Sequence, residues 1–124
     1  MADSYESIAK QFVEFYYTTF DADRSQLASL YRENSMLTFQ TASVLGVAGI
    51  VEKLKSLPFQ RIKHVPQEID AQPSFNNGVL VFVTGQLQVD EEERPMNFSQ
   101  VFQLSRDDAG QYYVHNDIFK LIFG

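Results

Sequence analysis

Residues 76–89 read NNGVLVFVTGQLQV, and this stretch decides the fold. Its first three residues, Asn-Asn-Gly, favour a hairpin turn because Asn and Gly tolerate the positive φ angles that such turns require. From Val79 onward the odd-numbered positions are apolar, which is the two-residue period of a strand with one buried face. Gly85 interrupts the alternation and therefore predicts a bulge or bend in a curved sheet.

Further strands are expected on both sides of this stretch. An apolar alternation around residues 98–104 predicts the next strand, and residues 112–121 predict the last one. Polar residues at 90–95 and 106–110 supply the turns between them. An earlier strand is expected at residues 36–40. Together these elements predict a long antiparallel meander in the second half of the chain.

The residues before this meander have the periodicity of helices. Asp3 followed by Glu6 resembles a capping box, with an acidic residue suited to the positive end of a helix dipole. The first helix is predicted from apolar side chains three and four residues apart, at Tyr5, Ile8, Ala9, Phe12, Val13, Tyr16 and Phe20.

Two shorter helices are expected after the first. Asp23 followed by Gln26 is a start signal for a helix that includes Leu27, Leu30 and Tyr31. A third helix runs through residues 47–54 and ends before Pro58.

Helices followed by an antiparallel meander indicate the α+β class. A strongly bent antiparallel sheet wrapped around the long N-terminal helix, with the two shorter helices packed on it, forms a cone-shaped roll with an apolar cavity. Eleven Phe and six Tyr side chains can fill or line such a cavity. Residues 1–124 are expected to form a single domain.

Composition excludes several classes of function. A net charge of −6 argues against nucleic acid and fits a partner that presents positive charge. The chain has no Cys and only two His, and no recognisable metal spacing, so neither thiol catalysis nor a metal site is expected. Residues 46–49 lack the Lys and Ser/Thr of a phosphate loop, so no bound nucleotide or other cofactor is expected. No signal peptide or membrane-length apolar stretch is present, which predicts an intracellular protein without membrane insertion.

Six short segments, in this order and at these spacings, carry a resemblance to a known family over essentially the whole chain. They are FYY with FD at 15–21, SMLTF at 35–39, IVEKL at 50–54, SLPFQ at 56–60, DAQP at 70–73 and NDIF at 116–119. The sequence is similar to the nuclear transport factor 2 family, the homodimeric carriers of GDP-bound Ran.

The resemblance implies a non-enzymatic carrier that dimerises through the outer face of its sheet. An aromatic side chain of GDP-bound Ran would enter the mouth of the cone while rim residues pair with flanking basic groups; those positions fall on Asp90, Glu92 and Gln40. A second site, for the FxFG repeats of nucleoporins, falls on Phe39 at the dimer edge. The carrier would be found in the cytoplasm and nucleus, concentrated at the nuclear pore and nuclear envelope.

Two residues depart from the family pattern. The family commonly has Glu where this chain has Gln40, and a neutral amide accepts a hydrogen bond but forms no ion pair, so weaker Ran binding is expected. Phe39 replaces an aromatic that is Trp in some relatives and still supplies a stacking face.

The acidic run at 90–93 also has a plain interpretation as a solvated hairpin tip. Within the resemblance, Asp90 and Glu92 alternate along an extended tip and point to one side. Glu91 and Glu93 then face away and serve only solubility.

The alternative is an enzyme or a ligand-binding protein that uses the cavity for a small hydrophobic molecule. Its acid–base candidates are His64, Asp70, His115 and Asp117. One residue of the pair Asn116 and Asp117 is interpreted instead as satisfying backbone donors. The remaining aromatic residues are assigned to the core or the cavity lining, among them Phe12, Phe15, Phe20, Phe59, Phe98, Phe102 and Phe119.

Overall fold

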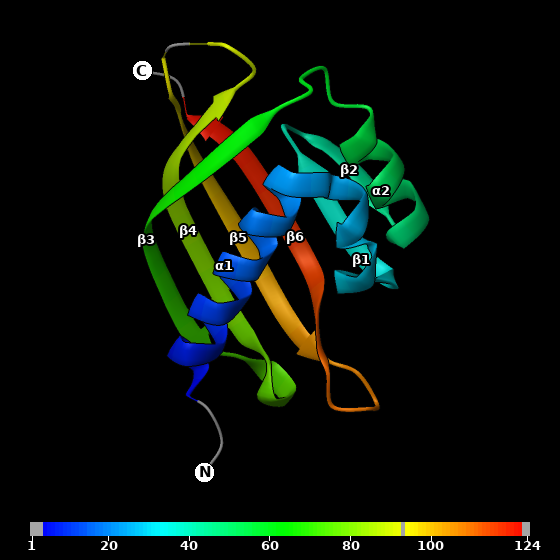
Figure 1. The fold of residues 1–124 in the computed structure, drawn as a ribbon. Helices are drawn as coiled ribbons and strands as arrows, with labels where there is room; N and C mark the ends of the chain where they lie inside the picture. The colour runs from blue at the N-terminus through cyan, green and yellow to red at the C-terminus, as the bar shows by residue number, and fades with distance from the viewer. Residues whose placement is uncertain (1–3, 93, 123–124) are drawn as a thin grey trace.

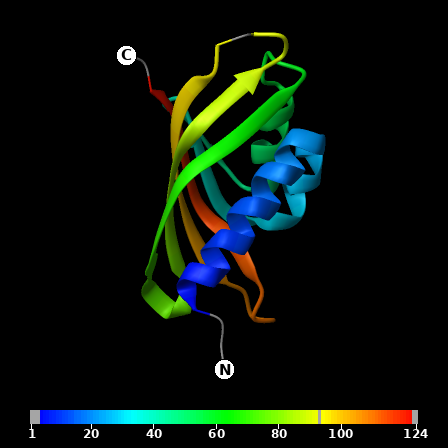
Figure 2. The same ribbon diagram turned by 60° about the vertical axis from the view of Figure 1, so that its left-hand side comes forward.

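A computed structural model describes residues 4–92 and 94–122. A long helix, α1, lies across one face of a six-stranded sheet with the strand order β2-β1-β6-β5-β4-β3 (Figure 1). The turned view shows the sheet bent around α1, with the helices on one side of it (Figure 2). The elements are α1 Tyr5–Asp23, the 3-10 helix η1 Arg24–Leu30, β1 Tyr31–Phe39, β2 Ala42–Leu45, α2 Val47–Lys55, β3 Ile62–Pro73, the 3-10 turn η2 Phe75–Asn77, β4 Val79–Val89, β5 Met96–Arg106 and β6 Tyr112–Ile122.

The predicted α+β roll is confirmed, with one correction to the sheet. Strands β3 to β6 form the expected antiparallel meander. Strand β1, however, pairs with β6 in parallel, so the sheet is mixed. The short strand β2 pairs with β1 in an antiparallel hairpin that the sequence analysis did not predict. The parallel pairing joins the first and last strands of the chain, and no local pattern indicates such a partner.

The helices form where the sequence predicts them, with small differences at their ends. The N-cap of α1 is Ser4, whose Oγ accepts the Ser7 N–H at 3.1 Å; the proposed cap Asp3 lies outside the described residues. The second helix is a 3-10 helix capped by Asp23, and Tyr31 already belongs to β1. Phe15 was assigned to the core, but it is 53% exposed on α1.

The expected alternation builds the core. Odd residues of β4 and even residues of β5 point toward α1, and Phe102 makes edge contacts with the rings of Phe12 and Tyr16. The turn before β4 differs in detail, because the positive φ angles fall on Asn76 and Asn77, whereas Gly78 is extended. This core fixes the relative positions of α1 and the sheet, and therefore the cavity between them.

The predicted bend at Gly85 is present, but the extra residue lies on the neighbouring strand. Gly85 pairs with Pro66, and the register of β3 shifts between Pro66 and Glu68. A Cβ on Gly85 would lie 2.4 Å from the carbonyl oxygen of Val65. Only glycine allows the two backbones to approach this closely. The first part of β3 packs against α1, and its residues Ile62 and His64 line the cavity.

Candidate binding cavity

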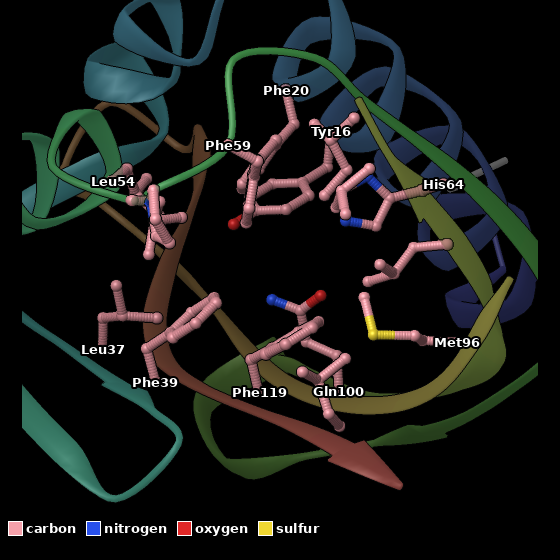
Figure 3. Close-up of a pocket in the computed structure, with 16 residues that line it drawn as sticks. Tyr16, Phe20, Leu37, Phe39, Leu54, Phe59, His64, Met96, Gln100 and Phe119 are labelled. Atoms are coloured by element: carbon pink, nitrogen blue, oxygen red, sulfur yellow. The ribbon is translucent and has the colours of Figure 1, made fainter. Parts of the chain in front are cut away.

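A cavity of about 270 Å³ lies between the C-terminal half of α1, α2, the loop that follows α2, and the ends of the sheet strands (Figure 3). Its lining is almost entirely apolar. The residues with polar groups are Gln100, His64 and Tyr16. The predicted apolar cavity is therefore present. The lining includes Phe20, Leu37, Phe39, Leu54, Phe59, Leu87, Met96, Phe119 and Leu121.

Stacked aromatic rings form one wall of this cavity. The ring of Phe119 stacks on that of Phe39 at 4.6 Å and 11° between planes, and on Phe98 from the other side at 5.6 Å. The opposite wall is held by Arg24, whose guanidinium lies 4.8 Å from the Phe59 ring centroid and donates to the Phe59 carbonyl oxygen at 2.6 Å. The walls thus offer flat apolar faces, which suit an aromatic guest.

His64 is the polar group that faces the cavity from β3. Its side chain is 2% exposed, and its Nδ1 lies 2.7 Å from Asp21 Oδ1. Asp21 Oδ2 accepts the His64 backbone N–H at 2.9 Å, so one carboxylate fixes both the strand and the ring. The ring also stacks on Tyr17 at 4.6 Å. The sequence analysis considered His64 but did not predict its pairing with Asp21.

A buried polar network lies behind the cavity wall. Asp117 Oδ2 accepts from the Tyr31 hydroxyl at 2.7 Å and from the Tyr16 hydroxyl at 3.2 Å, and Oδ1 accepts from Gln100 Nε2 at 2.7 Å. Gln100 Oε1 in turn accepts from the Tyr17 hydroxyl at 2.7 Å. Burial raises the pKa of Asp117 to about 6, and the three donors only partly oppose that rise.

This network shows what Asp117 binds. Its carboxylate accepts from side-chain donors, whereas the sequence predicts only that one of Asn116 and Asp117 satisfies backbone donors. Gln100 was missed, although it is the one polar residue among the inward positions of β5, where Phe98, Phe102 and Leu104 are its neighbours. A polar residue in an otherwise apolar alternation was the available signal.

Asp90 lies at the rim, in the turn after β4, and its neighbour Val89 lines the cavity. Asp90 Oδ1 accepts the backbone N–H groups of Gln60 and Arg61 at 3.0 and 2.9 Å. These backbone hydrogen bonds lower the pKa of Asp90, and the bond from Arg61 has the larger effect. The carboxylate therefore stays charged. Asp90 therefore both carries charge at the rim and holds the loop that follows α2.

The predicted extended tip is instead a tight turn. Asp90 has a φ of 49°, and the Glu92 N–H donates to the Val89 carbonyl oxygen at 3.0 Å. Glu92 is exposed, and Glu91 forms an exposed ion pair with Arg61 at 3.7 Å. The prediction that Asp90 and Glu92 alternate along an extended tip is therefore wrong. Glu93 lies outside the described residues.

Gln40 and Phe39 lie together at the end of β1. Gln40 has a φ of 49°, its N–H donates to the Phe119 carbonyl oxygen, and its Oε1 accepts the Leu121 N–H at 2.7 Å. Gln40 therefore extends the β1–β6 pairing through its side chain. Phe39 is half-buried in the cavity wall, so the two predicted sites adjoin.

The other acid–base candidates lie away from the cavity. Asp70 is exposed on the outer face of β3, and His115 is half-buried beside Tyr113 on β6. Neither residue lines the cavity, and neither does Asp117. Within residues 4–92 and 94–122, no three His, Cys, Asp or Glu side chains gather in a metal-binding arrangement. In the same ranges, none of the helices has the length and apolar character needed to cross a bilayer.

Comparison with known proteins agrees with this architecture. The model of the nuclear transport factor 2 domain matches residues 8–121. Nuclear transport factor 2 of Emericella nidulans is 60% identical over 124 residues, which are 99% of this chain and 98% of the relative. The Neurospora crassa protein of the same name is 57% identical, with 98% of each chain covered. The structure of nuclear transport factor 2 from Cryptosporidium parvum has a TM-score of 0.90 and 44% identity, covering 95% of this chain and 94% of that one.

These relatives are named as transport factors, which supports a role in nuclear transport, a nucleocytoplasmic location and a function other than catalysis. The fold, the cavity and the identity over nearly the full length agree with one another. The chain belongs to the nuclear transport factor 2 family.

Proposed function

We propose that this protein is a homodimeric carrier that binds GDP-bound Ran at the mouth of the cavity and moves it into the nucleus. The observation that carries the proposal is an aromatic-lined cavity of about 270 Å³ with the charged carboxylate of Asp90 at its rim. An aromatic side chain of the partner would fill the cavity, and Asp90 and Glu92 would attract its flanking basic groups. The net charge of −6 favours such a partner.

The rim residues contribute in different ways in this proposal. Asp90 uses only Oδ1 for the loop hydrogen bonds, so Oδ2 accepts none from the described residues and can pair with an arginine. Gln40 Oε1 already accepts the Leu121 N–H. A Glu at position 40 would retain that bond and add a charge, which is the physical reason for weaker Ran binding by Gln40.

FxFG repeats of nucleoporins are proposed to bind weakly at Phe39, so that the loaded carrier moves from repeat to repeat at the nuclear pore. A dimer offers at least two such sites, and their combined avidity holds the carrier at the pore although each contact releases quickly. Because Phe39 stacks on Phe119 in the cavity wall, Ran and repeat binding are expected to influence each other.

The charge pair at the rim gives the test of Ran binding. The double variant Asp90→Asn and Glu92→Gln should bind GDP-bound Ran at least about tenfold more weakly, because it removes two charges that face basic groups. Asn retains an oxygen for the Gln60 and Arg61 N–H groups and tolerates the positive φ of Asp90, so the fold is kept. Calorimetric titration against Ran loaded with GDP or GTP measures the affinities.

The matched control is Asp108→Asn, an exposed carboxylate in the β5–β6 turn at the other end of the sheet. It should leave Ran affinity unchanged. Equal affinities of wild type and the double variant, or equal binding of the GDP and GTP forms by wild type, would remove the proposed site.

The outer face of the sheet supports the proposed dimer. Phe82, Val101 and Ile118 lie opposite one another on β4, β5 and β6 and form an apolar row across the sheet. Phe82 is 41% exposed and Ile118 is 45% exposed, although both are large and apolar. A second copy of the chain would cover this row and remove it from water.

The variant Ile118→Glu should shift the protein from dimer to monomer, because it places a charge in the apolar row that the partner copy would cover. Sedimentation velocity measures the change. Asn97→Glu, near the end of the same face, is the matched control and should remain dimeric. An unchanged sedimentation coefficient for Ile118→Glu would show that this row is not the dimer interface.

A further inference from the structure

The ring of His64 presents a hydrogen-bonding atom, Nε2, to an apolar cavity. Nδ1 is paired with Asp21, and Nε2 lies on the other side of the ring, among the cavity-lining side chains (Figure 3). Among the described residues, no side chain or backbone group bonds to Nε2. Gln100, the other polar residue of the lining, uses its oxygen for Tyr17 and one amide N–H for Asp117, so what it has left is a donor. Among the described lining residues, His64 Nε2 is therefore the atom that can act as a hydrogen-bond acceptor for a guest.

The partner of Nδ1 determines what Nε2 can bind. A carboxylate only accepts hydrogen bonds, so a neutral imidazole beside Asp21 carries its proton on Nδ1. Nε2 is then an acceptor, and a guest must present an O–H or N–H group to satisfy it. The aromatic walls at Phe119, Phe39 and Phe59 favour a flat ring for the remainder of the guest.

The size of the cavity fits one small ring. An apolar cavity of about 150 Å³ already accommodates benzene, and the cavity here measures about 270 Å³. The ring of such a guest would be almost completely removed from water, and its single polar group would reach the buried imidazole.

We propose that the cavity binds a free small aromatic molecule with one hydrogen-bond donor, a phenol in its simplest form, whose hydroxyl group donates to His64 Nε2. This binding does not depend on the carrier function. If the proposed Ran site is correct, the same guest competes with the partner's aromatic side chain for the cavity, and that consequence alone rests on the proposed function.

The probes are 4-fluorophenol and fluorobenzene, titrated separately into the wild-type protein at one fixed pH and followed by fluorine NMR. Fluorobenzene is the more apolar of the two, so a cavity without a polar partner binds it at least as well. With His64 Nε2 as acceptor, 4-fluorophenol should bind about fivefold more tightly, which is the gain from one net hydrogen bond.

The variant Asp21→Asn tests the hydrogen bond at Nε2 directly, because a purely structural role of Asp21 and His64 would not change which probe the cavity prefers. The His64 backbone N–H can only donate, so the Asn oxygen must remain opposite it, and the Asn amide N–H group then faces Nδ1. Nδ1 becomes an acceptor, and the ring proton moves to Nε2. The preference for 4-fluorophenol over fluorobenzene should therefore disappear, and 4-fluoroacetophenone, whose carbonyl group only accepts, should bind more tightly than it does to wild type.

The variant Leu57→Trp fills part of the cavity and should weaken the binding of every probe, which locates them there. Folding of each variant is checked by circular dichroism. Three results would each overturn the proposal: no saturable binding to wild type, fluorobenzene binding as tightly as 4-fluorophenol, or a phenol preference that Asp21→Asn leaves unchanged. Undiminished binding to folded Leu57→Trp would assign the probes to another surface and would also overturn it.

Discussion

The variant Asp117→Asn is expected to gain about 2–3 kcal/mol of unfolding free energy relative to the wild-type protein as the pH rises from about 4 to about 7. The wild-type carboxyl has a pKa of about 6 in the folded protein, mainly because burial disfavours its charged form, against an ordinary value of 3.8. The folded state therefore holds the proton more tightly than the unfolded state does. Stability from this residue is fully present below about pH 4 and is lost as the pH rises through about 6.

Asparagine fits the same place without the charge. Its Oδ1 can accept from Gln100 Nε2, and its amide N–H groups can donate to the hydroxyl oxygens of Tyr31 and Tyr16. Those two hydroxyl groups are 2.8 Å apart, and either can donate to the other, so they can rotate to accept. The variant therefore retains the network, and it lacks the group whose ionisation is unfavourable.

Urea unfolding at a fixed protein concentration, repeated from pH 4 to pH 7.5, measures this difference. The difference between variant and wild type cancels the contribution of other carboxylates with lowered pKa, such as Asp23 and Asp107, because they are common to both proteins. Asp117→Ala is the matched control for packing. It leaves the hydroxyl and amide donors without their acceptor and should be about 2–3 kcal/mol less stable than Asp117→Asn at every pH. A variant-minus-wild-type difference that stays flat with pH would contradict the ionisation of buried Asp117.

The parts of the fold that follow from sequence are those fixed by neighbouring residues. The alternation from Val79 is visible because the two-residue period of a half-buried strand is local, and α2 ends where Pro58 predicts. The parallel pairing of β1 with β6 depends on which distant strands meet, and the strand β2 is only four residues long. Neither leaves a local signal.

The candidate site divides in the same way. The acidic run that begins at Asp90 is visible as a local charge pattern, but its assignment to a binding site, like that of Phe39, came from the resemblance to the family and stays a prediction. The pair of His64 and Asp21 joins residues 43 positions apart, and the bond from Tyr16 to Asp117 spans 101 positions. These contacts form only when α1 packs on the sheet. In the sequence the same residues are isolated polar positions, so their pairing could not be predicted.

Gly85 is recognisable from the local sequence and also allows the close approach of β4 to β3, which lines the cavity. Its replacement is expected to have the second large effect on the free energy of unfolding. The variant Gly85→Val should lose about 3 kcal/mol of unfolding free energy, at the upper end of overpacking costs. A Cβ would lie 2.4 Å from the Val65 carbonyl oxygen and 2.9 Å from the Pro66 Cα, and both are backbone atoms that no rotamer change can move. Urea unfolding measures the loss.

Thr84→Val is the matched control, since it places the same valine side chain one position away, where threonine already has a branched Cβ; its stability should stay within about 0.5 kcal/mol of wild type. The second readout is the cavity itself. Relief of the clash moves β3 away from β4, and β3 carries His64 and Ile62 into the lining, so hydrogen exchange at the His64 N–H should accelerate in Gly85→Val and remain slow in Thr84→Val. Equal stabilities for the two variants would show that β3 can move without cost. The bend would then be a consequence of α1 packing on the sheet, and Gly85 would not be its cause.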